Sequence, residues 1–125
     1  MYNLNQTNLL LRFALEIVAL ISIGVFAWTH FNFNGYLKYV VTLVLLIVVM
    51  IIWSVFAVSN DPSRNGQTVI AVNGVTRLVI EFMIFIMAVA ALYFSNLKTV
   101  SIIFLCLIIL HYIFSVERIK WLLNQ

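Results

Sequence analysis

Residues 37–58 read LKYVVTLVLLIVVMIIWSVFAV, and this run decides the class of fold. Its one charged residue is Lys38, near its start, and almost all of the other side chains are apolar. A helix of about 20 apolar residues crosses the roughly 30 Å of hydrocarbon in a bilayer. The run is therefore predicted to be a membrane-spanning helix.

Three further apolar runs of similar length give four predicted spans in one transmembrane domain, residues 1–125. The predicted helices cover about 8–28, 37–58, 73–94 and 99–121. Composition favours the same interpretation, since 65% of the 125 residues are hydrophobic and 9% are charged. A chain this short cannot hide so much apolar surface in one water-surrounded core. The expected fold class is an all-α, integral membrane four-helix bundle.

Polar stretches separate the runs. Residues 29–35 collect Asn and Gly, and residues 59–67 hold the only proline together with an Asn-Gly pair. Both compositions are typical of turns. Residues 95–98 form so short a link that the last two helices must make a tight antiparallel hairpin.

The distribution of Lys and Arg predicts the orientation in the membrane. An even number of spans places both termini on one side, together with Arg64, Arg118 and Lys120, while Lys38 and Lys98 lie opposite. Loops that carry more Lys and Arg stay in the cytoplasm. We therefore expect a multi-pass protein of the bacterial inner membrane with both termini cytoplasmic.

The first and third runs share the pattern Asn-x3-Arg-x3-Glu. The two copies are Asn8, Arg12 and Glu16, and Asn73, Arg77 and Glu81. A spacing of four residues places each trio on one face of its helix. The repeat predicts two similar helical hairpins that enter the membrane in the same direction, a parallel internal repeat. The two Asn residues are predicted to be helix N-caps.

Ions inside apolar helices need partners, because each costs on the order of 2.5 to 3.5 kcal/mol to insert. We predict that the first and third helices touch, with Arg12 near Glu81 and Arg77 near Glu16. Other polar residues lie at comparable depth. The complete predicted network is Arg12, Glu16, Arg77, Glu81, His111, Ser54 and Ser115.

Two functions fit such a network. One is a structural clasp in a scaffold or accessory subunit, and the alternative is a small proton-coupled transporter or exporter that uses Glu16 and Glu81. A transport pathway needs polar groups up to the outer face, and the outer halves offer little beyond Thr42, Thr99 and Ser101. This favours the clasp.

Enzyme activity is not expected. The sequence contains no glycine-rich phosphate loop, no His or Cys cluster with metal-ligand spacing and no nucleophile elbow. We therefore predict no catalytic residue, no metal site and no cofactor. The expected partners are the lipid bilayer and either a second copy of the chain or a membrane partner protein. Nucleic acid is not expected, because no basic run is present to meet a phosphate backbone.

Residues 10–16, LLRFALE, together with Trp53, Pro62, Arg77 and Glu81, resemble the YrdB family of small bacterial membrane proteins. The resemblance covers nearly the whole chain. It implies about four spans and singles out the Arg and Glu positions. It implies no substrate, cofactor or mechanism, since the family has no established activity.

The chain is also similar to the small multidrug-resistance exporters in length, in its four helices and in the glutamate midway along the first helix, here Glu16. It departs from them at Arg12, one turn away, and at the second Arg-Glu pair. A carboxylate that binds a cationic substrate should not be neutralised by a permanent guanidinium.

Overall fold

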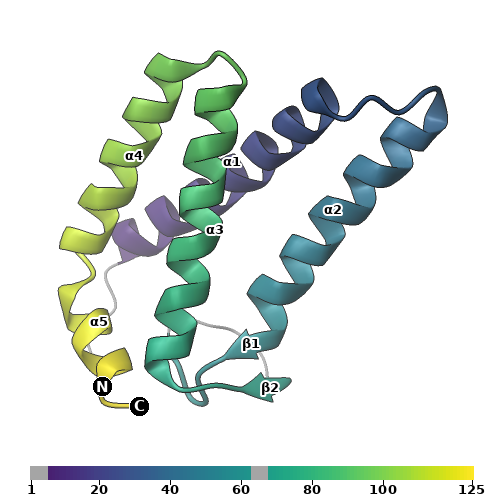
Figure 1. Ribbon diagram of the computed structural model, residues 1–125. Coiled ribbons are helices and arrows are strands. Elements are labelled where there is room, and N and C mark those ends of the chain that lie inside the picture. Colours follow the sequence, from purple (N-terminus) through teal and green to yellow (C-terminus); the bar gives the residue numbers. More distant parts are fainter. Residues whose placement is uncertain (1–5, 63–67) are drawn as a thin grey trace.

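The computed structural model describes residues 6–62 and 68–125, and within them the fold is helical apart from two very short strands. The elements in chain order are α1 (Gln6–His30), α2 (Tyr36–Val55), β1 (Phe56–Ala57), β2 (Ile70–Ala71), α3 (Gly74–Phe94), α4 (Lys98–Ile113) and α5 (Val116–Leu123) (Figure 1). The predicted all-α class is confirmed. Arg64 and the Asn-Gly turn pair lie outside the described residues.

The long helices suit a lipid environment. α1, α2 and α3 are long and apolar enough to cross a membrane, and α4 with α5 make a fourth span if the bent pair counts as one. α2 is the most exposed of them, with Val49 as its buried residue and Leu43, Ile47 and Ile51 among its exposed side chains. Exposed apolar surface of this extent is unfavourable in water, whereas the hydrocarbon of a bilayer accommodates it.

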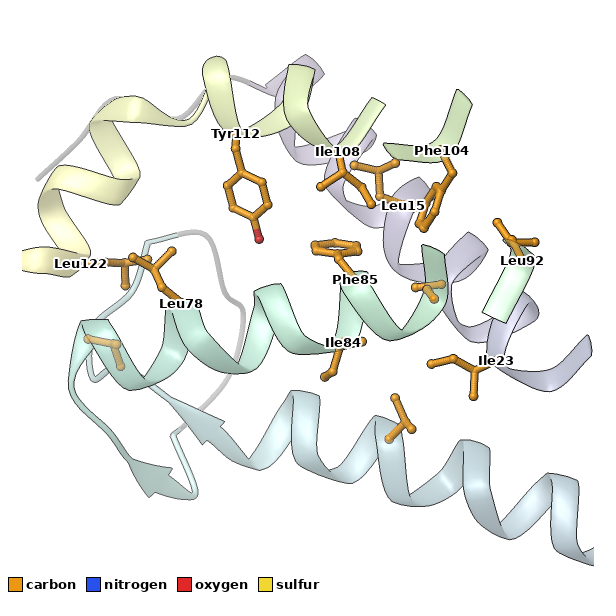
Figure 2. Packing of buried hydrophobic residues seen from close by; sticks show 14 residues of the cluster. Leu15, Ile23, Leu78, Ile84, Phe85, Leu92, Phe104, Ile108, Tyr112 and Leu122 are labelled. Atoms are coloured by element: carbon orange, nitrogen blue, oxygen red, sulfur yellow. The ribbon is translucent and has the colours of Figure 1, made fainter. Parts of the chain in front are cut away.

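The helices pack around α3. α1 crosses α3 obliquely in the most extensive helix contact of the described residues, as predicted, and α4 returns antiparallel beside α3 (Figure 1). Figure 2 shows Phe85 of α3 facing Tyr112 and Phe104 of α4. The ring centroids of Phe85 lie 6.2 Å from those of Tyr112 and 6.3 Å from those of Phe104, in edge-to-face geometry. This aromatic contact fixes the depth of α4 against α3.

The fourth predicted helix, residues 99–121, is not continuous. It ends at Ile113, and α5 leaves at 67° from α4. At the break the Ser115 hydroxyl donates to the His111 carbonyl at 2.8 Å, a local bond that competes with regular helix. Beyond it the buried side chains of α5 are Arg118 and Leu122, four residues apart on one face. The bend turns that face toward α3.

The second predicted helix, residues 37–58, also ends early, at Val55. Phe56–Ala57 instead pairs in parallel with Ile70–Ala71, which the sequence did not predict. The bond from Val72 N to Ala57 O, at 2.9 Å, extends this pairing. The ladder ties the chain that follows α2 to the chain that enters α3.

Gly74, the first residue of α3, lets α5 approach closely. A methyl group at this position would overlap the backbone of Leu122. The side chain of Leu122 is fully buried, and Figure 2 shows it directed toward Leu78 of α3. Since a backbone cannot move aside as a side chain does, any larger residue at Gly74 must displace α5.

Gly74→Ala is accordingly expected to destabilise the protein by about 1–3 kcal/mol, the usual cost of overpacking. Gly24→Ala is the matched control, because its new methyl would meet only the Leu46 side chain at 3.5 Å, an ordinary contact. Thermal unfolding of both variants in the same detergent measures the difference. Equal melting temperatures would contradict the close α3–α5 contact.

Candidate functional site: a buried cluster of arginines and acids

Glu81, on the second turn of α3, is the centre of the polar cluster, and its side chain is 1% exposed. Its Oε1 accepts from Arg12 Nη2 at 3.1 Å, from Arg77 Nε at 3.1 Å and from Arg118 Nη2 at 2.7 Å. Its Oε2 accepts from Arg118 Nη1 at 3.1 Å and from the Tyr112 hydroxyl at 3.1 Å. Both carboxylate oxygens are thus occupied by donors from four helices.

Two further acids flank this centre. Glu16 accepts from Arg12 Nε at 3.1 Å and from the Trp53 indole at 3.0 Å. Asp61, in the segment after β1, is buried and lies 3.4 Å from Arg118 Nη2. Glu16 differs from the others in exposure, with 26% of its side chain accessible.

The cluster is electrically balanced. Three guanidinium groups, of Arg12, Arg77 and Arg118, meet three carboxylates, of Glu16, Glu81 and Asp61. The net charge of +3 therefore resides in the rest of the chain, on three Lys, Arg64 and Glu117. Balance matters because an unpaired charge at this depth would carry an uncompensated desolvation cost.

Arg77 also holds the end of α2. Its Nη1 donates to the carbonyl oxygens of Trp53, at 2.6 Å, and Phe56, at 2.5 Å, and its guanidinium lies 5.6 Å from the Trp53 ring. The last carbonyls of a helix lack partners within the helix and favour a cation. Arg77 therefore joins the otherwise exposed α2 to the cluster and explains why that helix ends at Val55.

A second polar group lies where α1 meets the break between α4 and α5. The Asn8 amide is 2.6 Å from Ser115 Oγ and 2.8 Å from His111 Nδ1. Asn8 lies inside α1, so its predicted role as an N-cap is wrong. Asn73 does cap its helix, since its side chain accepts from Thr76 N at 2.8 Å.

The residues of the predicted network do not form one group in the structure. The pairing of Arg12 with Glu81 agrees with the prediction, but Arg77 forms its ion pair with Glu81 instead of Glu16. Ser54 lies on an exposed part of α2 and donates to the Ile51 carbonyl of its own helix at 3.4 Å. His111 and Ser115 belong to the group around Asn8.

The sequence reasoning missed Arg118, Asp61 and Tyr112 as members of the cluster. The sequence places Arg118 near the end of the fourth predicted helix, residues 99–121, where it was counted with Arg64 and Lys120 among the charges on the cytoplasmic side. The available signal was the segment 116–123, VERIKWLL, which is more polar than the run before it and places Arg118 and Leu122 on one helix face.

An apolar groove of about 620 Å³ lies between α3 and α4 on the other side of Tyr112. Phe82, Phe85, Leu105 and Ile109 are among its lining residues. Tyr112 lines the groove with its ring and donates to Glu81 with its hydroxyl. Among the described residues, no three His, Cys, Asp or Glu side chains are placed to hold a metal ion.

These features define a small all-helical protein whose apolar helices suit a membrane and whose buried charged residues, within the described part of the chain, form one cluster. The chain belongs to the family described as "Protein of unknown function (DUF2568)", whose model matches residues 10–109. It is 79% identical over 125 residues, the whole of both chains, to "Uncharacterized protein YrdB" of Bacillus subtilis (strain 168). The resemblance found in the sequence is thereby confirmed. No solved structure matches the chain.

Glu81→Gln is expected to destabilise the protein by about 3–5 kcal/mol, the usual cost of breaking a buried ion pair. The amide would point donors at guanidinium groups and would leave the cluster one negative charge short. Glu117→Gln, on the exposed side of α5, should stay within about 0.5 kcal/mol of the wild type. Chemical denaturation in detergent, compared between the two variants, measures the difference. Similar losses would show that Glu81 is not buried among the arginines.

Proposed function

We propose that this protein is a non-catalytic scaffold or accessory subunit of the bacterial inner membrane, in which the cluster around Glu81 acts as a structural clasp. The observation that carries the proposal is the saturation of Glu81 by five hydrogen bonds, four of them from arginines. A carboxylate used in transport has to release its partners and take up a proton or a cation. Glu81 is committed to holding α1, α3, α4 and α5 together.

The alternative function, a small proton-coupled transporter or exporter, now depends on Glu16. This carboxylate is partly accessible and has two donors, Arg12 and Trp53. It is the acid of the cluster that a proton would reach most easily. Glu81 offers this alternative little support, because every change in its charge disturbs three arginines.

The clasp fits a four-span bundle built from two related hairpins. Both copies of the repeat form the same contact within their own helix, from Arg12 Nε to Glu16 and from Arg77 Nε to Glu81, each at 3.1 Å. The copies differ in their contacts with other elements, because Arg77 also donates hydrogen bonds to two carbonyl oxygens at the end of α2. We infer that one duplicated hairpin supplied both Arg-Glu pairs and that Arg118 was added to one of them.

The proposed partners are lipid and either a second copy of the chain or another membrane protein, with no role for nucleic acid, metal or cofactor. The proposed topology has both termini in the cytoplasm. In a Cys106→Ala background, an impermeant maleimide added to intact cells should label Asn34→Cys and spare Ser59→Cys. Labelling of Ser59→Cys alone would reverse the orientation.

A double variant separates the clasp from the transporter. Arg12→Leu with Glu81→Leu removes one positive and one negative charge and leaves each remaining ion a contact. Glu16 still accepts a hydrogen bond from the Trp53 indole, and Arg77 still donates to a carbonyl at the end of α2. Arg118 still forms its ion pair with Asp61. Replacement of a buried ion pair by apolar residues is often neutral or stabilising. The double variant should therefore recover most of the folded yield that each single Leu variant loses.

The functional arm of this test is proton flux in reconstituted liposomes. For a clasp, wild type and double variant should behave alike, with no flux above that of empty liposomes. A wild type that conducts protons, with a folded Glu16→Gln variant that does not, would establish the transporter instead.

A further inference from the structure

The hydrogen bonds around Asn8 determine which nitrogen of His111 carries hydrogen. The Ser115 hydroxyl has one hydrogen, which it donates to the His111 carbonyl. Ser115 Oγ must therefore accept from Asn8, whose amide nitrogen lies 2.6 Å away. The Asn8 oxygen then faces His111 Nδ1 at 2.8 Å, and an oxygen acceptor requires a donor there. His111 Nδ1 thus carries a hydrogen, and in the neutral imidazole Nε2 then carries none.

This arrangement leaves the lone pair of His111 Nε2 unused. The residue is 2% exposed, and within the described part of the chain no hydrogen bond reaches Nε2. Nε2 is also the position at which a neutral imidazole of this tautomer takes a proton. Because the hydrogen bonds around Asn8 fix this tautomer, Nε2 is the ring nitrogen that accepts the proton.

Charged groups act on His111 from each helix packed around it. Arg12 of α1, Glu81 of α3 and Arg118 of α5 interact with it electrostatically, and the Tyr112 ring of its own helix lies 5.0 Å from it, centroid to centroid. With His111 neutral, the cluster is balanced. One added proton gives it a net positive charge, next to arginines whose common partner, Glu81, is already saturated.

We propose that His111 is a proton-binding site that opens the clasp: a proton taken from water onto Nε2 loosens α5 from α3. The inference rests on the proposed clasp and adds its regulation. The new charge is buried without an anion of its own, and its repulsion acts on Arg118, which anchors α5. A cation at the end of α4 gains from the helix dipole, but this gain is smaller than the cost of an unpaired buried charge. The closed form is therefore the form with neutral His111.

The test is the distance between spin labels on both sides of the α4–α5 bend. In a Cys106→Ala background, Thr99→Cys and Lys120→Cys place the labels at two exposed positions, one on each helix. The protein is measured in lipid nanodiscs at about pH 7.5 and about pH 3.5, well above and well below the ordinary titration of histidine. We expect one narrow distance distribution at the higher pH and a broader one, shifted to longer distances, at the lower pH.

Two variants make the outcome decisive. His111→Asn keeps an amide donor toward Asn8 and has no site for the proton, so its distribution should stay narrow at both pH values. Glu81→Gln removes the closer of the two carboxylates that hold Arg118 and should broaden the distribution at both. A wild type that stays narrow at both pH values, or a His111→Asn variant that broadens on acidification, would overturn the role of His111. A distribution that stays narrow in Glu81→Gln would instead overturn the clasp itself.

Discussion

The structure depends on one ionised carboxylate, Glu81, placed where no solvent can stabilise it. Removing a carboxylate and three guanidinium groups from water costs several kcal/mol for each ion, and only close, well-directed partners offset this cost. The cluster meets the requirement with bonds of 2.7 to 3.1 Å to both oxygens of Glu81. This geometry constrains the positions of α1, α4 and α5, because each of them contributes a donor that must reach Glu81.

Apolar packing could not fix those positions alone. In a bilayer, lipid is as apolar as the helix surfaces, so association of helices depends on close packing and polar contacts. α2 illustrates the point, because almost all of its surface is exposed while the Arg77 guanidinium holds its end. α5 illustrates it again, because Arg118 and the close approach at Gly74 hold it across the start of α3. The ions therefore supply the specificity of the fold.

The sequence predicted the parts of this arrangement that follow from polar residues inside apolar runs. Arg12 and Glu81 are ions of opposite charge inside apolar helices, so their pairing is predictable without a structure. The break after Ile113 is not readable in the same way. No Pro or Gly marks it, and the helix bends there because Arg118 and Leu122 find better contacts on α3 than on a straight continuation. Asn8 was misassigned because its partners, His111 and Ser115, lie more than 100 residues further along the chain.

The central claim is that Arg118 and Glu81 are in contact when the protein is in a membrane. Solid-state NMR of the protein in lipid bilayers, with the arginine side-chain nitrogens and the glutamate carboxyl carbons isotopically labelled, measures this contact directly. Assignment of the Arg118 resonance by comparison with Arg118→Lys identifies the pair. The account predicts a strong nitrogen-to-carboxyl correlation between Arg118 and Glu81, as expected for the 2.7 Å bond. An Arg118 side chain that shows no correlation with Glu81, and correlates with water or lipid headgroups, would contradict it.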